Sequence, residues 1–279
     1  MIIDIHVHAF PKDIRENRET YFDGEPAFRL LYDSPKSRLV SAGEIVAAMD
    51  AGGVDKSVIF GFPWRSDAFF RANNDYIIDA VSRYPDRLIG FCCLDPAHPG
   101  ALGEVARCLD AGLSGVGELA FYEGGIDEGC LAALDPVMAL CAERDVPVMI
   151  HTNEPVGHAY PGKTPNTLAQ IDALLKRFAG NRIILAHWGG GIFLYSLMKK
   201  EVRETLKNTW FDTAASPYLY DMKIYRMAVD LLGPGKILLG TDFPLLAPAR
   251  YFKEMTEAGL TADEMAAVTG GNASALLKI

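Results

Sequence analysis

Two histidines close the first apolar run of the chain, which reads Met1-Ile2-Ile3-Asp4-Ile5-His6-Val7-His8. Side chains two residues apart on a β-strand point to the same face, so His6 and His8 would project together. Two imidazoles at the end of a buried strand can share one metal ion, and zinc is commonly bound by imidazole nitrogen. The same pattern also fits a half-buried strand without a metal, so the pair alone does not decide between these interpretations.

Four further polar side chains lie at or near the ends of apolar runs later in the chain. They are Glu118 in Gly115–Leu119, His151 after Val148–Ile150, His187 after Ile183–Ala186, and Asp242 after Ile237–Thr241. Taken singly, each could be a hydrogen-bonded rim residue or a turn residue. In a parallel α/β barrel, however, the carboxyl ends of the strands converge on one mouth. We therefore expect these side chains to join His6 and His8 in a shared metal site.

The elements that must position these residues are short apolar strands alternating with helices. The strands are nearly continuous in apolar residues, which is typical of a parallel sheet covered on both faces. Eight strands are expected at Ile2–His8, Lys56–Phe62, Leu88–Leu94, Gly115–Leu119, Pro147–His151, Ile183–His187, Trp210–Thr213 and Ile237–Thr241. Helices are expected at Ala42–Ala51, Asn73–Tyr84, Gly100–Ala111, Leu131–Arg144, Thr167–Phe178, Phe193–Leu206 and Tyr218–Leu232.

This alternation predicts a (β/α)8 TIM barrel that forms a single domain over residues 1–279. An open doubly wound sheet would need a glycine-rich phosphate turn after its first strand, where this chain has His-x-His. Additional C-terminal helices are expected at Ala249–Ala258, Thr261–Thr269 and Asn272–Leu277. Pro136 is expected in the first turn of a helix or at a break before one. The long connections Phe10–Val40 and Thr152–Pro165 both follow strands, so they are candidate lids over the active face.

Composition narrows the class of protein. The chain has 279 residues, 49% of them hydrophobic, and a formal net charge of −9, so we expect no nucleic-acid partner. No apolar run reaches the roughly 18 residues of a membrane span, and the N-terminus lacks the basic segment of a signal peptide. We expect a cytoplasmic protein with reduced cysteines that acts on a small molecule; a homodimer is compatible with the sequence.

These residues together resemble the amidohydrolase superfamily. The likeness extends from Asp4-Ile5-His6-Val7-His8 through His151, His187 and Thr241-Asp242-Phe243-Pro244 to the final Gly271-Asn272-Ala273. The chain is similar in particular to the amidohydrolase-2 branch, which includes aminocarboxymuconate-semialdehyde decarboxylase-like enzymes. The resemblance implies that His6, His8, His151 and Asp242 are metal ligands. It also implies that Asp242 accepts a proton from metal-bound water, and that His187 is a catalytic acid/base or a second-metal ligand.

The number of metal ions is left open by the resemblance. No lysine ends the fourth or fifth strand, so the carboxylated-lysine bridge of some relatives is absent there. Glu118 instead occupies the position at which deoxyribonuclease-like members of the superfamily have a bridging carboxylate. We expect one divalent metal ion, Zn2+ or alternatively Mn2+, with Glu118 as the candidate bridge to a second.

Metal-activated water attacking an electrophilic carbon is the chemistry that this ligand set implies. We expect hydrolysis of an amide, ester or lactone in a small molecule that could carry a carboxylate. A non-oxidative decarboxylase of an unsaturated or aromatic acid is the main alternative, because the ligand set does not distinguish the two reactions. A non-catalytic binding protein on the same barrel and a deoxyribonuclease-like enzyme are further alternatives.

Four residues near the predicted strand ends are candidates to bind substrate. Arg65 follows the second strand and could pair with a substrate carboxylate. Glu154 and Lys163 lie in the connection after the fifth strand, and Lys163 could meet the same kind of group. Trp188 could form a wall of the pocket, with Gly189-Gly190-Gly191 allowing a close approach of the backbone after it.

Overall fold

The computed structural model describes residues 1–279, and its strands form a closed parallel barrel. The strands are β1 (Ile3–His8), β2 (Lys56–Phe60), β3 (Leu88–Cys92), β4 (Gly115–Leu119), β5 (Val148–Ile150), β6 (Ile183–Leu185), β7 (Thr209–Asp212) and β8 (Ile237–Leu238). They pair in sequence order from β1 to β8. Backbone bonds from Ile5 N–H to Leu239 O and from His8 N–H to Phe243 O join the last strand to the first. The predicted (β/α)8 barrel is confirmed.

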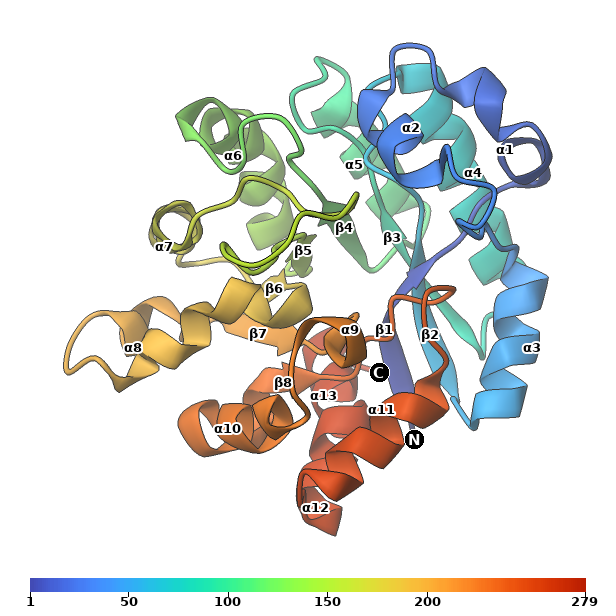
Figure 1. The fold of residues 1–279 in the computed structure, drawn as a ribbon. Coiled ribbons are helices and arrows are strands. Elements are labelled where there is room, and N and C mark those ends of the chain that lie inside the picture. Colours follow the sequence, from blue (N-terminus) through green and yellow to red (C-terminus); the bar gives the residue numbers. More distant parts are fainter.

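Helices surround the barrel on its outside (Figure 1). They are α1 (Lys12–Glu16), α2 (Pro26–Tyr32), α3 (Ala42–Gly52), α4 (Asp67–Arg83), α5 (Ala101–Asp110), α6 (Glu128–Glu143), α7 (Leu168–Arg177), α8 (Val202–Thr205), α9 (Ser216–Leu219), α10 (Lys223–Leu232), α11 (Pro248–Glu257), α12 (Ala262–Ala266) and α13 (Asn272–Leu277). Shorter 3₁₀ segments cover Arg18–Tyr21, His187–Leu197 and Pro234–Lys236, and a π-helical turn covers Ala267–Gly271. None of the helices combines the length and apolar composition that a membrane span requires.

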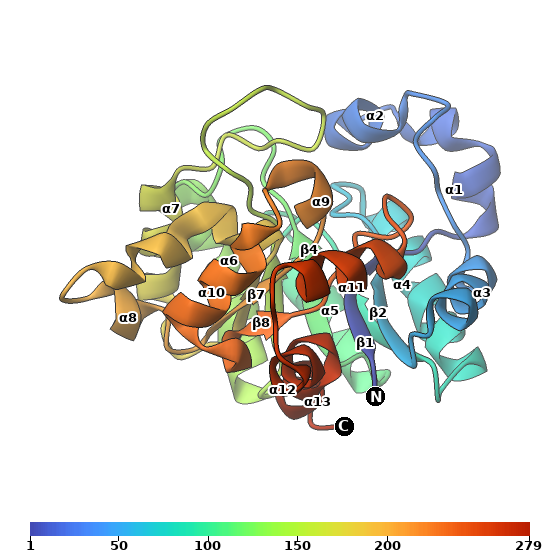
Figure 2. The same ribbon diagram turned by 60° about the horizontal axis from the view of Figure 1, so that its bottom comes forward.

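The two ends of the barrel have different coverings. Figure 2 shows both chain termini at one end, and α1, α2, α9 and the connection after β5 at the other. The second end is formed by the carboxyl ends of the strands, because β1 begins beside the N-terminus. Side chains that end the strands therefore lie under a cover built from the two long connections. The connection after β1 is not a plain loop, since it contains α1 and α2.

Two helix predictions were wrong. Pro136 lies inside the continuous helix α6 rather than in its first turn or at a break. A helix over residues 193–206 is absent, and the segment from His187 is a 3₁₀ structure followed by the short α8. Glu201 has a φ of 72°, which interrupts a right-handed helix there. The apolar spacing of this stretch therefore predicted a helix that the backbone does not form.

A left-handed turn follows β6, with positive φ from His187 through Gly191. Gly190 packs so closely against the connection after β5 that a Cβ would lie 2.4 Å from the Asn153 carbonyl oxygen. A residue with a side chain would also be strained at its φ of 61°. The glycine run therefore permits the close backbone approach that was predicted for it, and holds the β5 and β6 connections together.

Candidate metal centre

A cavity of about 690 Å³ opens at the carboxyl ends of the strands. Its floor includes His8, Glu118, His151, His187 and Asp242, five of the six residues predicted to form a metal site. His6 lies directly beneath, fully buried, and contacts Glu118 and Asp242. The structure thus brings all six side chains together from the ends, or the immediate continuations, of five strands: β1, β4, β5, β6 and β8.

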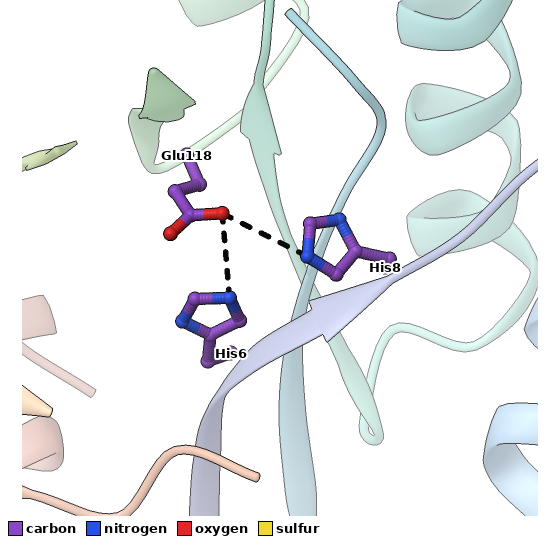
Figure 3. A group of neighbouring side chains, drawn as sticks. All are labelled: His6, His8 and Glu118. Carbon is purple, nitrogen blue, oxygen red and sulfur yellow. Dashed lines mark ion pairs between the residues drawn. The ribbon is translucent and has the colours of Figure 1, made fainter. Parts of the chain in front are cut away.

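Glu118 occupies the middle of this cluster, and one of its oxygens faces β1 (Figure 3). Its Oε2 lies 3.5 Å from His6 Nε2 and 3.8 Å from His8 Nε2. Asp242 closes the same side, with its Oδ1 3.4 Å from His8 Nε2 and 3.8 Å from His6 Nε2. Asp242 is held beside β1 because its backbone N–H donates to His6 O at 3.0 Å. Two imidazoles and two carboxylates therefore converge on this side.

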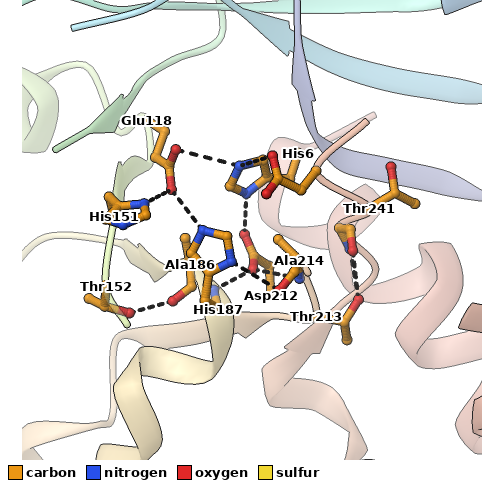
Figure 4. A network of polar contacts seen from close by, with 12 residues as sticks. His6, Glu118, His151, Thr152, Ala186, His187, Asp212, Thr213, Ala214 and Thr241 are labelled. Atoms are coloured by element: carbon orange, nitrogen blue, oxygen red, sulfur yellow. Dashed lines mark hydrogen bonds and ion pairs between the residues drawn. The ribbon is translucent and has the colours of Figure 1, made fainter. Parts of the chain in front are cut away.

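The other oxygen of Glu118 faces β5 and β6 (Figure 4). Its Oε1 lies 2.9 Å from His151 Nδ1 and 3.4 Å from His187 Nε2. The rings of His151 and His187 meet edge to face, with centroids 4.9 Å apart. The cluster therefore has two halves that share one buried carboxylate.

Each of the four histidines is oriented by a hydrogen bond at its outer nitrogen. The contacts are His6 Nδ1 with Asp212 Oδ2 (2.8 Å), His8 Nδ1 with Gly61 O (3.2 Å), His151 Nε2 with Gly162 O (2.9 Å) and His187 Nδ1 with Ala214 O (2.9 Å). A carbonyl or carboxylate oxygen can only accept, so each outer nitrogen carries the proton. The inner nitrogens then face Glu118 and Asp242, as lone pairs where the ring is neutral and as N–H donors where it is protonated. Partners of this kind are what fix metal-binding histidines in other proteins.

Asp212, at the end of β7, is part of this cluster and was not predicted from the sequence. It is fully buried, and besides His6 it accepts hydrogen bonds from the backbone N–H groups of His187 (2.8 Å) and Ala214 (3.0 Å). A single carboxylate therefore orients one histidine side chain and the backbone of a second. Its position at the end of an apolar strand was the available signal.

The charges of the cluster shift its pKa values in the metal-free protein. Burial alone would raise the pKa of Glu118, but the neighbouring charges of His6 and His151 outweigh burial and hold it well below its usual range. Burial would lower the pKa of His187, but the hydrogen bond and charge of Glu118 raise it to about 9. Glu118 is therefore ionised. When no metal is bound, protonated histidine, including His187, supplies the positive charge that faces it.

The donor set fits a divalent metal ion. Imidazole nitrogen and carboxylate oxygen are ligands for zinc, manganese and similar cations. His6 Nε2 is buried without any hydrogen-bond partner, although it points into the cluster. Three overlapping groups have ligand atoms within 4.8 Å of one another, namely His6–His8–Glu118, His6–His187–Asp242 and Glu118–His151–His187. None of these three groups contains all four predicted ligands, His6, His8, His151 and Asp242. The groups are joined because Glu118 and His187 each belong to two of them.

The four predicted substrate-binding residues do not line the cavity. Arg65 turns away to pair with Glu123 at 2.8 Å. Trp188 is fully buried in the core, where its Nε1–H donates to Ser216 at 2.9 Å. Glu154 and Lys163 pair with each other at 3.0 Å and brace the connection after β5 from within.

Other residues form the wall and mouth of the cavity. Tyr122 lies nearly parallel to His151, with ring centroids 6.0 Å apart, and nearly parallel to Phe62, with centroids 6.4 Å apart. Lys36 and Arg38, in the segment after α2, also line the cavity, and the guanidinium of Arg38 lies 5.9 Å from the centre of the Phe243 ring. Tyr32, His158, Tyr160 and Tyr218 are further lining residues. The result is a cavity with aromatic walls, a histidine–carboxylate floor and two cations near its edge.

Comparisons with known proteins agree with this architecture. A family model described as amidohydrolase matches residues 3–279. A 2-amino-3-carboxymuconate-6-semialdehyde decarboxylase from Dictyostelium discoideum is 25% identical, over 97% of this chain and 90% of that protein.

Two solved structures share the fold. A 5-carboxyvanillate decarboxylase from Novosphingobium aromaticivorans, complexed with manganese, has a TM-score of 0.78 at 18% identity, covering 100% of this chain and 96% of that one. A dihydroxybenzoic acid decarboxylase from Polaromonas sp., with bound manganese and 2-nitroresorcinol, has a TM-score of 0.74 at 18% identity, covering 99% and 96% of the two chains.

The prediction of amide, ester or lactone hydrolysis was wrong in the light of these relatives, because all three are decarboxylases. The error has a chemical cause, since a metal site that polarises an oxygen serves both reactions. The comparisons support an enzyme, as predicted, rather than a non-catalytic binding protein. They give no specific support to zinc, because the metal in both solved relatives is manganese.

Proposed function

The chain belongs to the amidohydrolase family, and we propose that within it the protein is a metal-dependent, non-oxidative decarboxylase of a small unsaturated or aromatic acid. The observation that carries this proposal is the combination of an aromatic-walled cavity with a histidine–carboxylate floor. The match to a decarboxylase along 97% of the chain favours loss of CO2 over hydrolysis.

The size and walls of the cavity suit a planar acid. A volume of about 690 Å³ lies within the usual range for small-molecule sites. Tyr122 and Phe62 both line the cavity and give it an aromatic wall against which an aromatic or conjugated group can pack. Arg38 and Lys36 can pair with a carboxylate or phenolate at the outer end of such a molecule. These residues take the part that the sequence had assigned to Arg65 and Lys163.

The reaction replaces a carboxylate with a proton at one carbon and needs no oxidant or reductant. In a conjugated or aromatic acid, a proton added to the carbon that carries the carboxylate takes an electron pair from the π system. When the bond to the carboxylate then breaks, its electron pair returns to the π system, CO2 leaves and a C–H bond remains. Among the ionisable groups on the cavity floor, Asp242 and His187 are the two that we propose to hold or move this proton.

A divalent cation held by the histidine–carboxylate cluster would supply a positive charge that polarises substrate oxygens during this reaction. The chain contributes the orientation of the ligands, through Asp212 and the backbone carbonyls that fix the histidine tautomers. We propose Mn2+ as the cation to test first, because both solved relatives contain manganese.

A substrate panel tests the proposed function. Metal-stripped protein reconstituted with Mn2+ would be incubated with 5-carboxyvanillate, 2,6-dihydroxybenzoate and related hydroxybenzoates, alongside amides, esters and lactones. We expect CO2 release from at least one acid, and no release by protein carrying His8→Ala, which should lose metal but remain folded. Turnover of the esters, amides or lactones without CO2 release from any acid would contradict the proposal.

A further inference from the structure

We propose that Arg18 is a positioning residue for substrate binding, because its guanidinium fixes the turn that carries Lys36 and Arg38 at the mouth of the cavity. Arg18 begins the 3₁₀ segment Arg18–Tyr21, which lies between α1 and α2 in the cover over the mouth (Figure 2). It does not itself line the cavity. The inference deepens the proposed function and rests on that part of it in which Lys36 and Arg38 bind an acid.

The guanidinium of Arg18 contacts three main-chain carbonyl oxygens of one turn. Its Nη1 donates to Ser37 O at 2.6 Å and lies 3.4 Å from both Tyr32 O and Ser34 O. Tyr32 is the last residue of α2, and carbonyls in the last turn of a helix have no partner within the helix. A guanidinium is always charged and offers several donors in one plane. One side chain can therefore gather these carbonyls.

The other hydrogen bonds of this turn are local. The Ser37 N–H donates to Ser34 O at 3.0 Å, and the Ser37 hydroxyl donates to Leu31 O at 2.7 Å. The Lys36 N–H donates to Ser34 Oγ at 3.3 Å. These bonds fold the turn onto the end of α2 without connecting it to another element. Because most of the turn is also exposed, packing holds it only weakly, and Arg18 is the polar link that anchors it.

The path of this turn sets where the two cations lie. Lys36 and Arg38 both line the cavity, and the guanidinium of Arg38 lies 5.9 Å from the centre of the Phe243 ring. Phe243 directly follows Asp242, so Arg38 extends from the cover towards the cavity floor. Long, exposed side chains lose rotamer freedom when they bind a ligand, and a fixed backbone lowers that cost. Arg18 therefore favours acid binding without touching the acid.

Binding of two simple acids tests the inference. Equilibrium dialysis would give the Kd of Mn2+-loaded protein for isophthalate, which has two carboxylates, and for benzoate, which has one. We expect wild-type protein to prefer isophthalate, and Arg18→Met to weaken isophthalate binding by about 5- to 10-fold while leaving benzoate binding unchanged, because the loss is limited to one charge-assisted contact. No preference in wild-type protein, or an unchanged preference in Arg18→Met, would overturn the inference.

A combined variant shows whether Arg18 acts through the two cations. In protein that carries Lys36→Ala and Arg38→Ala, Arg18→Met should not weaken isophthalate binding further, because changes that remove the same contact are not additive. Arg18→Lys keeps a charged donor and should restore most of the preference for isophthalate. Arg29→Met is the matched control, because Arg29 is an exposed residue of α2 that pairs with Asp33 at 3.9 Å, and it should bind as wild type does. An equal loss in both backgrounds would overturn the inference.

Circular dichroism would establish that the variants are folded. If Arg18→Met does not fold, Arg18→Gln replaces it with the same expectation, because glutamine is neutral and too short to gather the carbonyls that Arg18 contacts. CO2 is not measured in these experiments. Failure of decarboxylation would therefore leave the binding test intact, and failure of the binding test would leave decarboxylation unaffected.

Discussion

Replacing Asp212 with asparagine should weaken Mn2+ binding while leaving the barrel folded. Asp212 Oδ2 accepts the proton on His6 Nδ1, and Oδ1 accepts two backbone N–H groups. The oxygen of asparagine can keep the two backbone bonds. Its NH2 group then faces His6 Nδ1, and a hydrogen bond forms only if the imidazole proton moves to Nε2. His6 would then present an N–H group, rather than a lone pair, to the metal site.

The size of the effect follows from the loss of one ligand's preferred tautomer. Changes in outer-shell partners of metal-binding histidines cost about 10- to 100-fold in affinity. We expect the upper part of this range, about 100-fold or roughly 2.7 kcal/mol, because His6 is fully buried and water cannot replace Asp212.

Calorimetric titration of metal-free protein with Mn2+ is the assay, with thermal unfolding monitored in parallel. Asp79→Asn is the matched control, because Asp79 pairs with Arg83 on the exposed face of α4, away from the cavity. Its affinity for Mn2+ should equal that of the wild type. Wild-type affinity in folded Asp212→Asn protein would refute the argument that this carboxylate sets the tautomer of His6.

Three further predictions concern the cavity, the backbone and the dependence of stability on pH. Arg38→Ala should raise KM for an active acid substrate about 10-fold in steady-state kinetics, because a charge-assisted contact is lost. Arg65→Ala should leave KM unchanged. Equal effects of the two substitutions on KM would contradict the placement of Arg38 at the substrate. Gly190→Ala should lower the free energy of unfolding by about 2–4 kcal/mol in denaturant unfolding, because of left-handed strain and overpacking. Gly180 has open space around it, so Gly180→Ala should lower the free energy of unfolding by about 1 kcal/mol or less. Hydrogen bonds from Arg226 lower the pKa of Glu264 to about 2. The contribution of Glu264 to the stability of the fold is therefore complete above its ordinary pKa of 4.5 and is lost as pH falls towards 2. The difference in Tm between wild type and Glu264→Gln should shrink over that range, and a constant difference would refute it.

The barrel and the position of its metal centre could be predicted because they follow from strand ends. Parallel strands carry nearly continuous apolar runs, so a histidine or carboxylate at the end of a run is conspicuous in the sequence. Barrel topology then brings those ends to one mouth. Asp212 escaped notice because Asp212-Thr213-Ala214 reads equally well as a turn or a helix cap.

The walls of the cavity could not be predicted in the same way. Which basic residue faces the cavity depends on the path of a long connection and on nearby acids. Arg65 is drawn to Glu123 and Lys163 to Glu154, whereas Arg38 has no such partner and lines the cavity. Neither the path nor the pairing has a periodic signal in the sequence.

The type of reaction was also beyond the sequence pattern. The ligands specify where an oxygen is polarised, and that polarisation assists hydrolysis and decarboxylation alike. The choice between the two depends on how the cavity presents the substrate to the cluster.

Decarboxylation in D2O by Mn2+-reconstituted protein would show whether the histidine–carboxylate cluster supports metal-dependent loss of CO2. Mass spectrometry would follow an active hydroxybenzoate or carboxyvanillate together with released CO2, and chelator-treated protein would be the control. We expect one CO2 per product molecule and one deuterium on the carbon that carried the carboxylate, with activity lost on chelation and restored by Mn2+. Equal activity of the metal-free protein, or products of bond hydrolysis without CO2, would contradict this expectation.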